Sequence, residues 1–136
     1  MTAAVISAFI DRDFARETEF LAELVKVASD NPPGDCAPHA QRARELLRSL
    51  GLEVEVYDVP RSAVAATGMI SATNLIVRHR FGDGPVIALN AHGDVVPAGL
   101  GWRFDPYGAT IEEGPHGPVM YGRGAAVSKS DFATYT

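Results

Sequence analysis

The segment VIALNAHGDVVP, residues 86–97, joins the pattern of a buried strand to a pair of polar side chains. Its first four residues are apolar, which is typical of a strand in a protein interior. His92 and Asp94 then follow, two residues apart. Because α/β proteins bind ligands beyond the carboxyl ends of their strands, a strand over 86–90 predicts a functional site at His92 and Asp94.

Two helices are expected upstream of this segment. Asp11 or Asp13 is placed to cap the first helix, and the prolines of SDNPPG (29–34) must end it, since proline lacks the amide hydrogen and restricts the preceding residue. The second helix is expected to begin near Pro38 and to end at Gly51, a residue suited to the left-handed conformation. The residues expected on the buried faces are Phe14, Leu21, Leu24, Val25 and Ala28 in the first helix, and Ala40, Ala43, Leu47 and Leu50 in the second.

Strands are expected over 53–57, where apolar and polar residues alternate, and over 74–80 and 86–90. The turn residues 81–85 predict that the last two strands form a hairpin. Residues 61–73 carry no clear pattern and are expected to be a loop, as is the part rich in glycine and proline after the last strand. Helices followed by strands predict an α/β fold in which helices pack on a mixed β-sheet.

Composition limits the classes of function. The 136 residues, 46% of them hydrophobic, suffice for one domain over 1–136, and no second domain is expected. The chain has 12 basic and 17 acidic residues, a net charge of −5 and no basic stripe, so nucleic acid is not an expected partner. It shows neither a basic secretory leader nor the ~20 apolar residues of a membrane span, and its one cysteine, Cys36, gives no sign of an oxidising compartment. A soluble, cytoplasmic protein without a membrane partner is therefore expected.

The pair His92 and Asp94 suits a metal site. In an extended segment, residues two apart point to the same side, and Gly93 between them adds no side chain and tolerates unusual dihedral angles. A metal-bound histidine commonly donates its second N–H to a carboxylate, which fixes the tautomer of the ring. The alternative interpretation is a solvated turn after a strand, because a hydrolytic zinc site needs three or four ligands and this triplet names one.

Two further motifs follow in order, WRFDPY (102–107) and YGRG (121–124). Together with the segment 92–97 and the earlier LVKVASDNPPGD (24–35), they resemble the N-terminal part of the co-catalytic zinc metallopeptidase family, which implies a helix over 127–136 after YGRG. That family includes acetylornithine deacetylase, succinyl-diaminopimelate desuccinylase, aminoacylase and the glutamate-releasing carboxypeptidases. The resemblance runs through most of the chain and implies the N-terminal portion of a metallopeptidase-like catalytic domain.

The resemblance makes His92 a zinc ligand and Asp94 the carboxylate that orients it in the catalytic centre. It also implies an aspartate that bridges two zinc ions, at the third residue after YGRG. That residue is Val127, which cannot ligate, so the second of the two zinc sites is expected to weaken severely. Asp131, one helical turn or about 5.4 Å further on, is the nearest substitute, although a capping or solvated role is favoured for it. His116 is expected to be an exposed turn residue, and a site shared with His92 stays open.

The implied activity is zinc-dependent hydrolysis of an amide bond in an N-acyl amino acid or small peptide, in a chain longer than this one. Zinc would polarise the scissile carbonyl and lower the pKa of a bound water, and a glutamate would shuttle the proton. The family's glutamate pair, remaining ligands and dimerisation domain lie beyond this length, so catalysis and homodimer formation are expected only where those parts are present. The alternative is a non-catalytic or metal-impaired relative that binds a ligand or a partner. Arg123 and Lys129 are expected to be solvated or salt-bridged.

Overall fold

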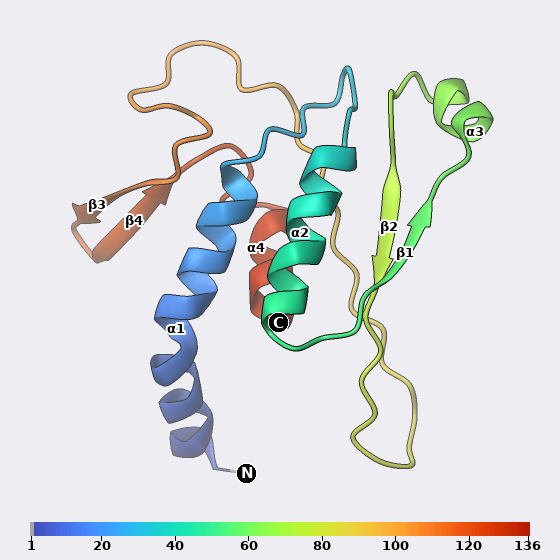
Figure 1. Ribbon diagram of the computed structural model, residues 1–136. Coiled ribbons are helices and arrows are strands. Elements are labelled where there is room, and N and C mark those ends of the chain that lie inside the picture. Colours follow the sequence, from blue (N-terminus) through green and yellow to red (C-terminus); the bar gives the residue numbers. More distant parts are fainter. Residues whose placement is uncertain (1) are drawn as a thin grey trace.

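The computed structural model describes residues 2–136 and folds them into four helices and four short strands (Figure 1). In chain order these are α1 (Ala3–Val25), α2 (Ala37–Ser49), β1 (Glu55–Asp58), α3 (Arg61–Ala66), β2 (Thr73–Ile76), β3 (Thr110–Gly114), β4 (Gly117–Tyr121) and α4 (Ser128–Tyr135). Across these residues, no helix combines the length and the apolar character needed to cross a membrane.

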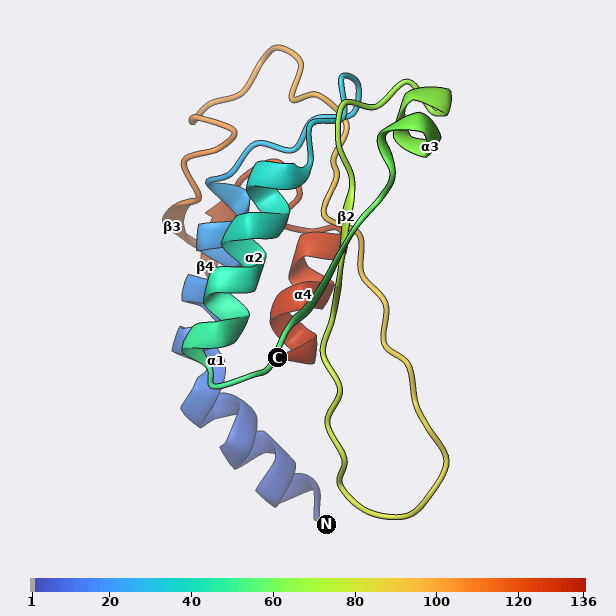
Figure 2. The same ribbon diagram turned by 45° about the vertical axis from the view of Figure 1, so that its right-hand side comes forward.

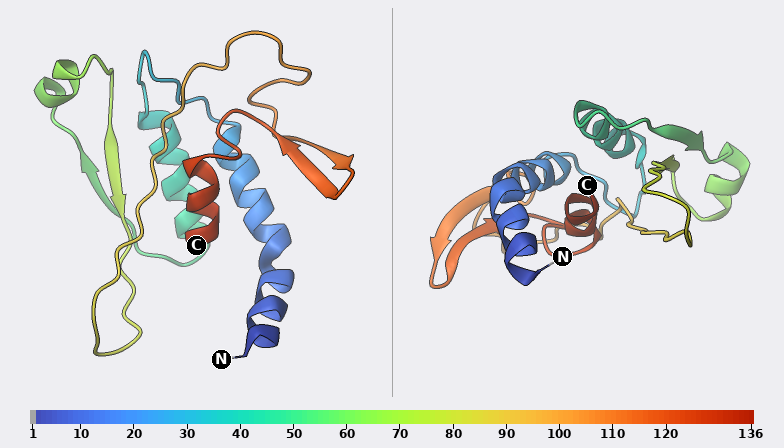
Figure 3. Two further views of the ribbon diagram at one scale, coloured as in Figure 1. Left: turned by 180° about the vertical axis from the view of Figure 1, so that it is seen from behind. Right: turned by 90° about the horizontal axis from the view of Figure 1, so that it is seen from below.

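The three longer helices build the core. α1 packs against α2 and α4, and α2 also packs against β2. Seen from below, α1, α2 and α4 lie around a common interior (Figure 3). Burying each large apolar side chain there stabilises the fold by about 1.5–3 kcal/mol. The fully buried cluster consists of Phe20, Leu24, Ala43, Leu47 and Ala133.

The strands form two separate antiparallel ribbons. In the first, β1 pairs with β2 so that Glu55 lies opposite Ile76. In the second, β3 pairs with β4, and Thr110 lies opposite Tyr121. Figure 1 shows the first ribbon on the α2 side of the molecule and the second on the α1 side. The α/β class is confirmed, with its strands in two ribbons rather than in one mixed sheet.

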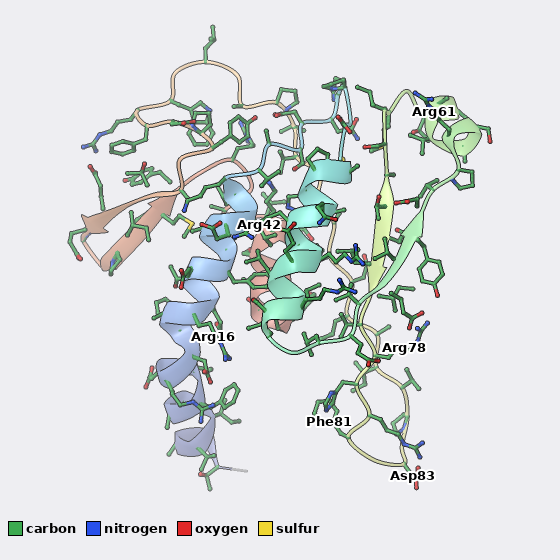
Figure 4. All side chains as sticks on the ribbon, viewed as in Figure 1. Arg16, Arg42, Arg61, Arg78, Phe81 and Asp83 are labelled. Atoms are coloured by element: carbon green, nitrogen blue, oxygen red, sulfur yellow. The ribbon has the colours of Figure 1, made fainter. Side chains whose placement is uncertain are left out.

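The prediction that residues 74–80 and 86–90 form a hairpin is wrong. β2 pairs with β1 instead, and residues 86–90 form no strand. Figure 4 shows Phe81 and Asp83 near the tip of a long loop that projects away from the helices. An apolar run becomes a strand only where a neighbouring strand supplies hydrogen bonds, and Val86, at 94% exposure, has no such neighbour.

The first helix begins earlier than expected. α1 starts directly after Thr2, so Asp11 and Asp13 lie inside it rather than at its cap. The alanine-rich start of the chain favours helix strongly enough to carry it back to that point. The carboxylate of Asp13 instead accepts hydrogen bonds from the side chain of Arg12, with a shortest distance of 2.6 Å, and lies 3.2 Å from Arg16.

The residues predicted to lie on the buried faces of the two helices are confirmed near the core, and the prediction is wrong near the start of the chain. Phe14 is 60% exposed, because the N-terminal half of α1 extends beyond the other two helices (Figure 2). Ala28 lies beyond the end of α1 and is exposed. The expected residues that are buried are Leu24, Val25, Ala40, Ala43 and Leu47, and Leu21 and Leu50 pack against them while partly buried.

Of the remaining predictions of secondary structure, those for the second helix are confirmed and those for the loops are partly wrong. Pro38 lies in the first turn of α2, and Gly51 follows that helix with a φ of +81°, as its sequence position predicted. The stretch 61–73 is not a loop throughout, because it contains α3 and the start of β2. The loops expected after the last strand are interrupted by the β3–β4 ribbon.

Candidate metal site

The backbone that carries His92 and Asp94 is held by the segment that follows α1. The N–H of Val95 donates to the carbonyl of Ser29 at 3.0 Å, and the N–H of Asn31 donates to the carbonyl of Val95 at 2.7 Å. The buried hydroxyl of Ser29 also donates to the carbonyl of Gly93 at 2.6 Å. These contacts join residues more than sixty positions apart and fix the segment 92–95 against the end of α1.

The ring of His92 is oriented by Asp94. Its Nδ1 atom lies 3.0 Å from the backbone carbonyl oxygen of Asp94 and 3.2 Å from the Oδ1 atom of the carboxylate. A carbonyl oxygen only accepts hydrogen bonds, so Nδ1 must carry the hydrogen in this arrangement. The lone pair of the neutral ring is then on Nε2, and the side chain of His92 is 58% exposed.

Two further side chains brace this pair. The Nδ2 amide of Asn31 donates to Oδ2 of Asp94 at 3.1 Å, so the carboxylate lies between an amide donor and the imidazole. The backbone N–H of His92 donates to the hydroxyl of Ser128 at 2.9 Å, which joins the segment 92–95 to the first residue of α4. Sequence reasoning missed both residues, because it assigned Asn31 only to the stretch that ends the first helix.

Position 93, between His92 and Asp94, has no room for a side chain. Gly93 does not have a positive φ, so the unusual dihedral angles expected for it are not the reason for its presence. A Cβ atom built on Gly93 would lie 2.5 Å from Nδ1 and 2.7 Å from Cε1 of His39. The ring of His39, on the first turn of α2, therefore packs directly against the Gly93 backbone.

His39 is a second histidine beside the site that sequence reasoning did not single out. It is 3% exposed, and burial together with the charge of Lys129 lowers its pKa to about 3, despite the opposing effect of Asp94. The ring is therefore neutral near pH 7. Its apolar neighbours on α2 and its place at the start of that helix gave no signal of contact with position 93.

The other candidate ligands complete no ligand group with His92 in the described residues, or lack donor atoms. Val127 precedes α4 directly and is 54% exposed, next to the Ser128 that binds the His92 backbone. Asp131 lies in the first turn of α4, and His116 is an exposed residue in the β3–β4 turn, as expected. Within residues 2–136, no group of three or more His, Cys, Asp or Glu side chains is placed to hold a metal ion.

The two cationic residues of the C-terminal motif differ in exposure. Lys129 is not solvated, contrary to expectation, whereas Arg123 is half-buried. Lys129 is fully buried, and its Nζ atom donates to the carbonyls of Leu24 and Val27 at 3.0 Å each. Arg123 donates to the carbonyl of Ala98 at 2.9 Å, and its guanidinium lies 5.1 Å from the centre of the Trp102 ring. Both side chains therefore hold backbone segments rather than forming ion pairs.

The aromatic motif also anchors the loop that follows the site. The hydroxyl of Tyr107 lies 2.5 and 2.6 Å from the two carboxylate oxygens of Asp30 and donates to that carboxylate. Burial and this contact with Asp30 raise the pKa of Tyr107 to about 12. The indole N–H of Trp102 donates to the carbonyl of Ala98 at 2.8 Å. The end of the 98–107 loop is thereby joined to Asp30, in the segment that also binds residues 93–95.

Comparison with known proteins matches part of the sequence to one family. The sequence model of Peptidase family M20/M25/M40 matches residues 88–136, which include His92, Asp94 and α4. A succinyl-diaminopimelate desuccinylase of Zymomonas mobilis is 35% identical over 118 residues, covering 86% of this chain and 28% of that protein. The enzyme of the same name from Acidiphilium cryptum is 36% identical over 103 residues, covering 68% and 26%, and that from Wolinella succinogenes is 38% identical over 86 residues, covering 60% and 22%.

The chain spans about a quarter of the length of these curated relatives. No solved structure matches it. The helices and the antiparallel ribbons make the described part of the chain an α/β fragment. The chain belongs to the M20/M25/M40 family of peptidases, in agreement with the resemblance of its motifs.

Proposed function

We propose that this chain supplies the first zinc ligand of a metal-dependent amidohydrolase that acts on N-acyl amino acids or small peptides. The observation that carries the proposal is the orientation of His92. With its Nδ1 hydrogen directed at Asp94, the ring offers the Nε2 lone pair to a cation from an exposed position. A metal-bound histidine that is held from behind by an acid is a recurrent arrangement in zinc proteins.

The donor set of this chain fits one ligand position of a zinc ion. A neutral imidazole nitrogen is a common zinc ligand, and a catalytic zinc ion needs three protein ligands. Because residues 2–136 hold no group of three such side chains, the other ligands would come from elsewhere in the protein. When bound, zinc polarises the amide carbonyl and lowers the pKa of its water. In this proposal His92 supplies the imidazole, and Asp94 holds that ring in the tautomer that can ligate zinc.

The relatives narrow the substrate class to test first. Several of them are named succinyl-diaminopimelate desuccinylase, so N-succinyl amino acids are the first candidates. Release of succinate by the natural gene product, and its loss on His92→Ala, tests the reaction. A cytoplasmic location and homodimer formation belong to the same proposal.

Zinc binding by the natural gene product tests the proposed site, because the proposal takes the remaining ligands from outside residues 2–136. Calorimetric titration with Zn²⁺ should give binding by the wild type and none by His92→Ala. His116→Ala is the matched control, because it removes an equally exposed histidine from the β3–β4 turn. Equal zinc affinity in the wild type and His92→Ala would remove His92 from the proposed site.

The alternative, a metal-impaired relative that binds a ligand or partner, has one observation in its favour. Val127 stands where the family resemblance implies a bridging carboxylate, and no other acid joins His92 and Asp94 in a ligand group of the described chain. A natural gene product that neither binds zinc nor hydrolyses N-acyl amino acids would favour this alternative.

A further inference from the structure

The contact between His39 and Gly93 brings a side chain of α2 directly beneath the candidate site. The flat imidazole ring occupies the space in which a Cβ atom of residue 93 would lie, 2.5 Å from Nδ1 and 2.7 Å from Cε1. The ring also packs edge-on against Phe132 of α4, with 6.3 Å between ring centres. His39 is thus enclosed between two elements and is 3% exposed.

Hydrogen bonding does not explain why a histidine fills this place. The Nε2 atom of His39 is buried and has no hydrogen-bond partner among residues 2–136. A buried polar atom without a partner destabilises a fold by about 1–3 kcal/mol, so an apolar side chain would serve a purely structural role better. What the ring provides is a flat surface on which the Gly93 backbone can lie.

The Gly93 backbone is consequently held from two directions. The Ser29 hydroxyl binds its carbonyl oxygen at 2.6 Å, and the His39 ring supports it from the α2 side. Gly93 is the one residue between His92 and Asp94, so its dihedral angles set how the imidazole faces the carboxylate. A change of those angles would break the 3.0 Å contact that fixes the His92 tautomer.

We propose that His39 is a positioning residue for the His92–Asp94 pair, acting through the backbone of Gly93 and not as a ligand. The expected effect on zinc binding, the preorganisation of a zinc ligand, rests on the proposed function. The geometric part of the inference does not depend on zinc, because the contacts of His39 with Gly93 and of His92 with Asp94 involve protein atoms alone.

The test changes the size of the side chains at positions 93 and 39 and uses two measurements. Gly93→Ala introduces the methyl group that meets the ring, and the double variant His39→Ala/Gly93→Ala removes the obstacle. Gly84→Ala is the matched control, because a Cβ atom there meets open space at an ordinary φ. The first readout is the ¹⁵N NMR signal of the His92 ring nitrogens in metal-free protein, at one pH well above the ordinary pKa of histidine. The second is the zinc affinity of the natural gene product, measured by competition with a chelator.

We expect Gly93→Ala to shift the His92 ring signals and to weaken zinc binding by about 10- to 100-fold, the range typical of lost outer-sphere support. The double variant should recover most of both, and Gly84→Ala should match the wild type. If Gly93→Ala does not fold, recovery of folding by the double variant supports the proposal, and failure of both variants overturns it.

The two proposals fail separately. If the wild type takes up no zinc while the ring signals follow the expected pattern, the zinc site is wrong and the positioning role of His39 stands. If zinc binds but Gly93→Ala leaves the ring signals and the affinity unchanged, the positioning role is overturned. A double variant no better than Gly93→Ala also overturns it.

Discussion

The burial of Lys129 in the core can be tested quantitatively through the pH dependence of stability. The side chain is fully buried, and its Nζ atom donates to the carbonyls of Leu24 and Val27 at 3.0 Å each. Burial lowers the pKa of Lys129 from 10.5 to about 8, and the nearby charge of Asp30 opposes this only in part. The two carbonyls need two N–H donors, which a neutral amine still supplies, so loss of the proton leaves both hydrogen bonds in place.

These properties set how stability depends on pH. Because the pKa is lower in the folded state, the unfolded chain binds the extra proton between about pH 8 and 10.5, and the free energy of unfolding rises with pH across that window. The full shift is equivalent to about 3 kcal/mol, at about 1.4 kcal/mol for each pH unit. The gain is complete above pH 10.5 and is lost as the pH falls through about 8.

The assay is urea unfolding of the wild type and Lys129→Met from neutral pH to pH 10.5. Methionine keeps an unbranched apolar stem but cannot titrate, so the difference between the two proteins isolates the Lys129 proton. We expect the wild type to gain about 2–3 kcal/mol relative to the variant over this range. A difference that stays constant or decreases with pH would refute the conclusion that a desolvated ammonium group occupies the core.

Three further variants test the surroundings of the site. Asn31→Ala removes the amide that holds Asp94, and we expect about tenfold weaker zinc binding in a chelator competition, since support of this kind is worth about 10- to 100-fold; unchanged affinity would exclude Asn31 from the site. Tyr107→Phe leaves the half-buried carboxylate of Asp30 without its hydroxyl donor and should lower the free energy of unfolding by about 1–3 kcal/mol in urea titrations, whereas a neutral effect would show that water replaces the hydroxyl. Val127→Asp places a good N-cap directly before α4 and should stabilise the chain by about 0.5–2 kcal/mol in the same assay. A tighter zinc complex in that variant would show that position 127 faces the metal, and equal affinity that it does not.

Local patterns in the sequence were sufficient for several parts of the fold. The apolar stripe of α2 and the left-handed Gly51 after it follow from spacing and residue type alone, and both are confirmed. The relation of His92 to Asp94 is also local, because two residues of one extended segment face the same side. Their roles in metal binding stay predictions.

Tertiary contacts account for what the sequence did not reveal. The segment 86–90 has the composition of a strand, but strand formation depends on a partner that periodicity cannot identify. The contact of Asn31 with Asp94 joins positions 63 apart in sequence. Lys129 is buried only because the ends of α1 and α4 meet and offer it two carbonyls, and no pattern within α4 encodes that meeting.

Crystals of the protein grown with Zn²⁺ and measured at the zinc absorption edge test the central claim most directly. The proposal predicts an anomalous peak about 2.0–2.1 Å from Nε2 of His92, with Nδ1 of the same ring still facing Asp94. A zinc peak elsewhere with none beside His92, or a ring turned so that Nδ1 faces the metal, would contradict it.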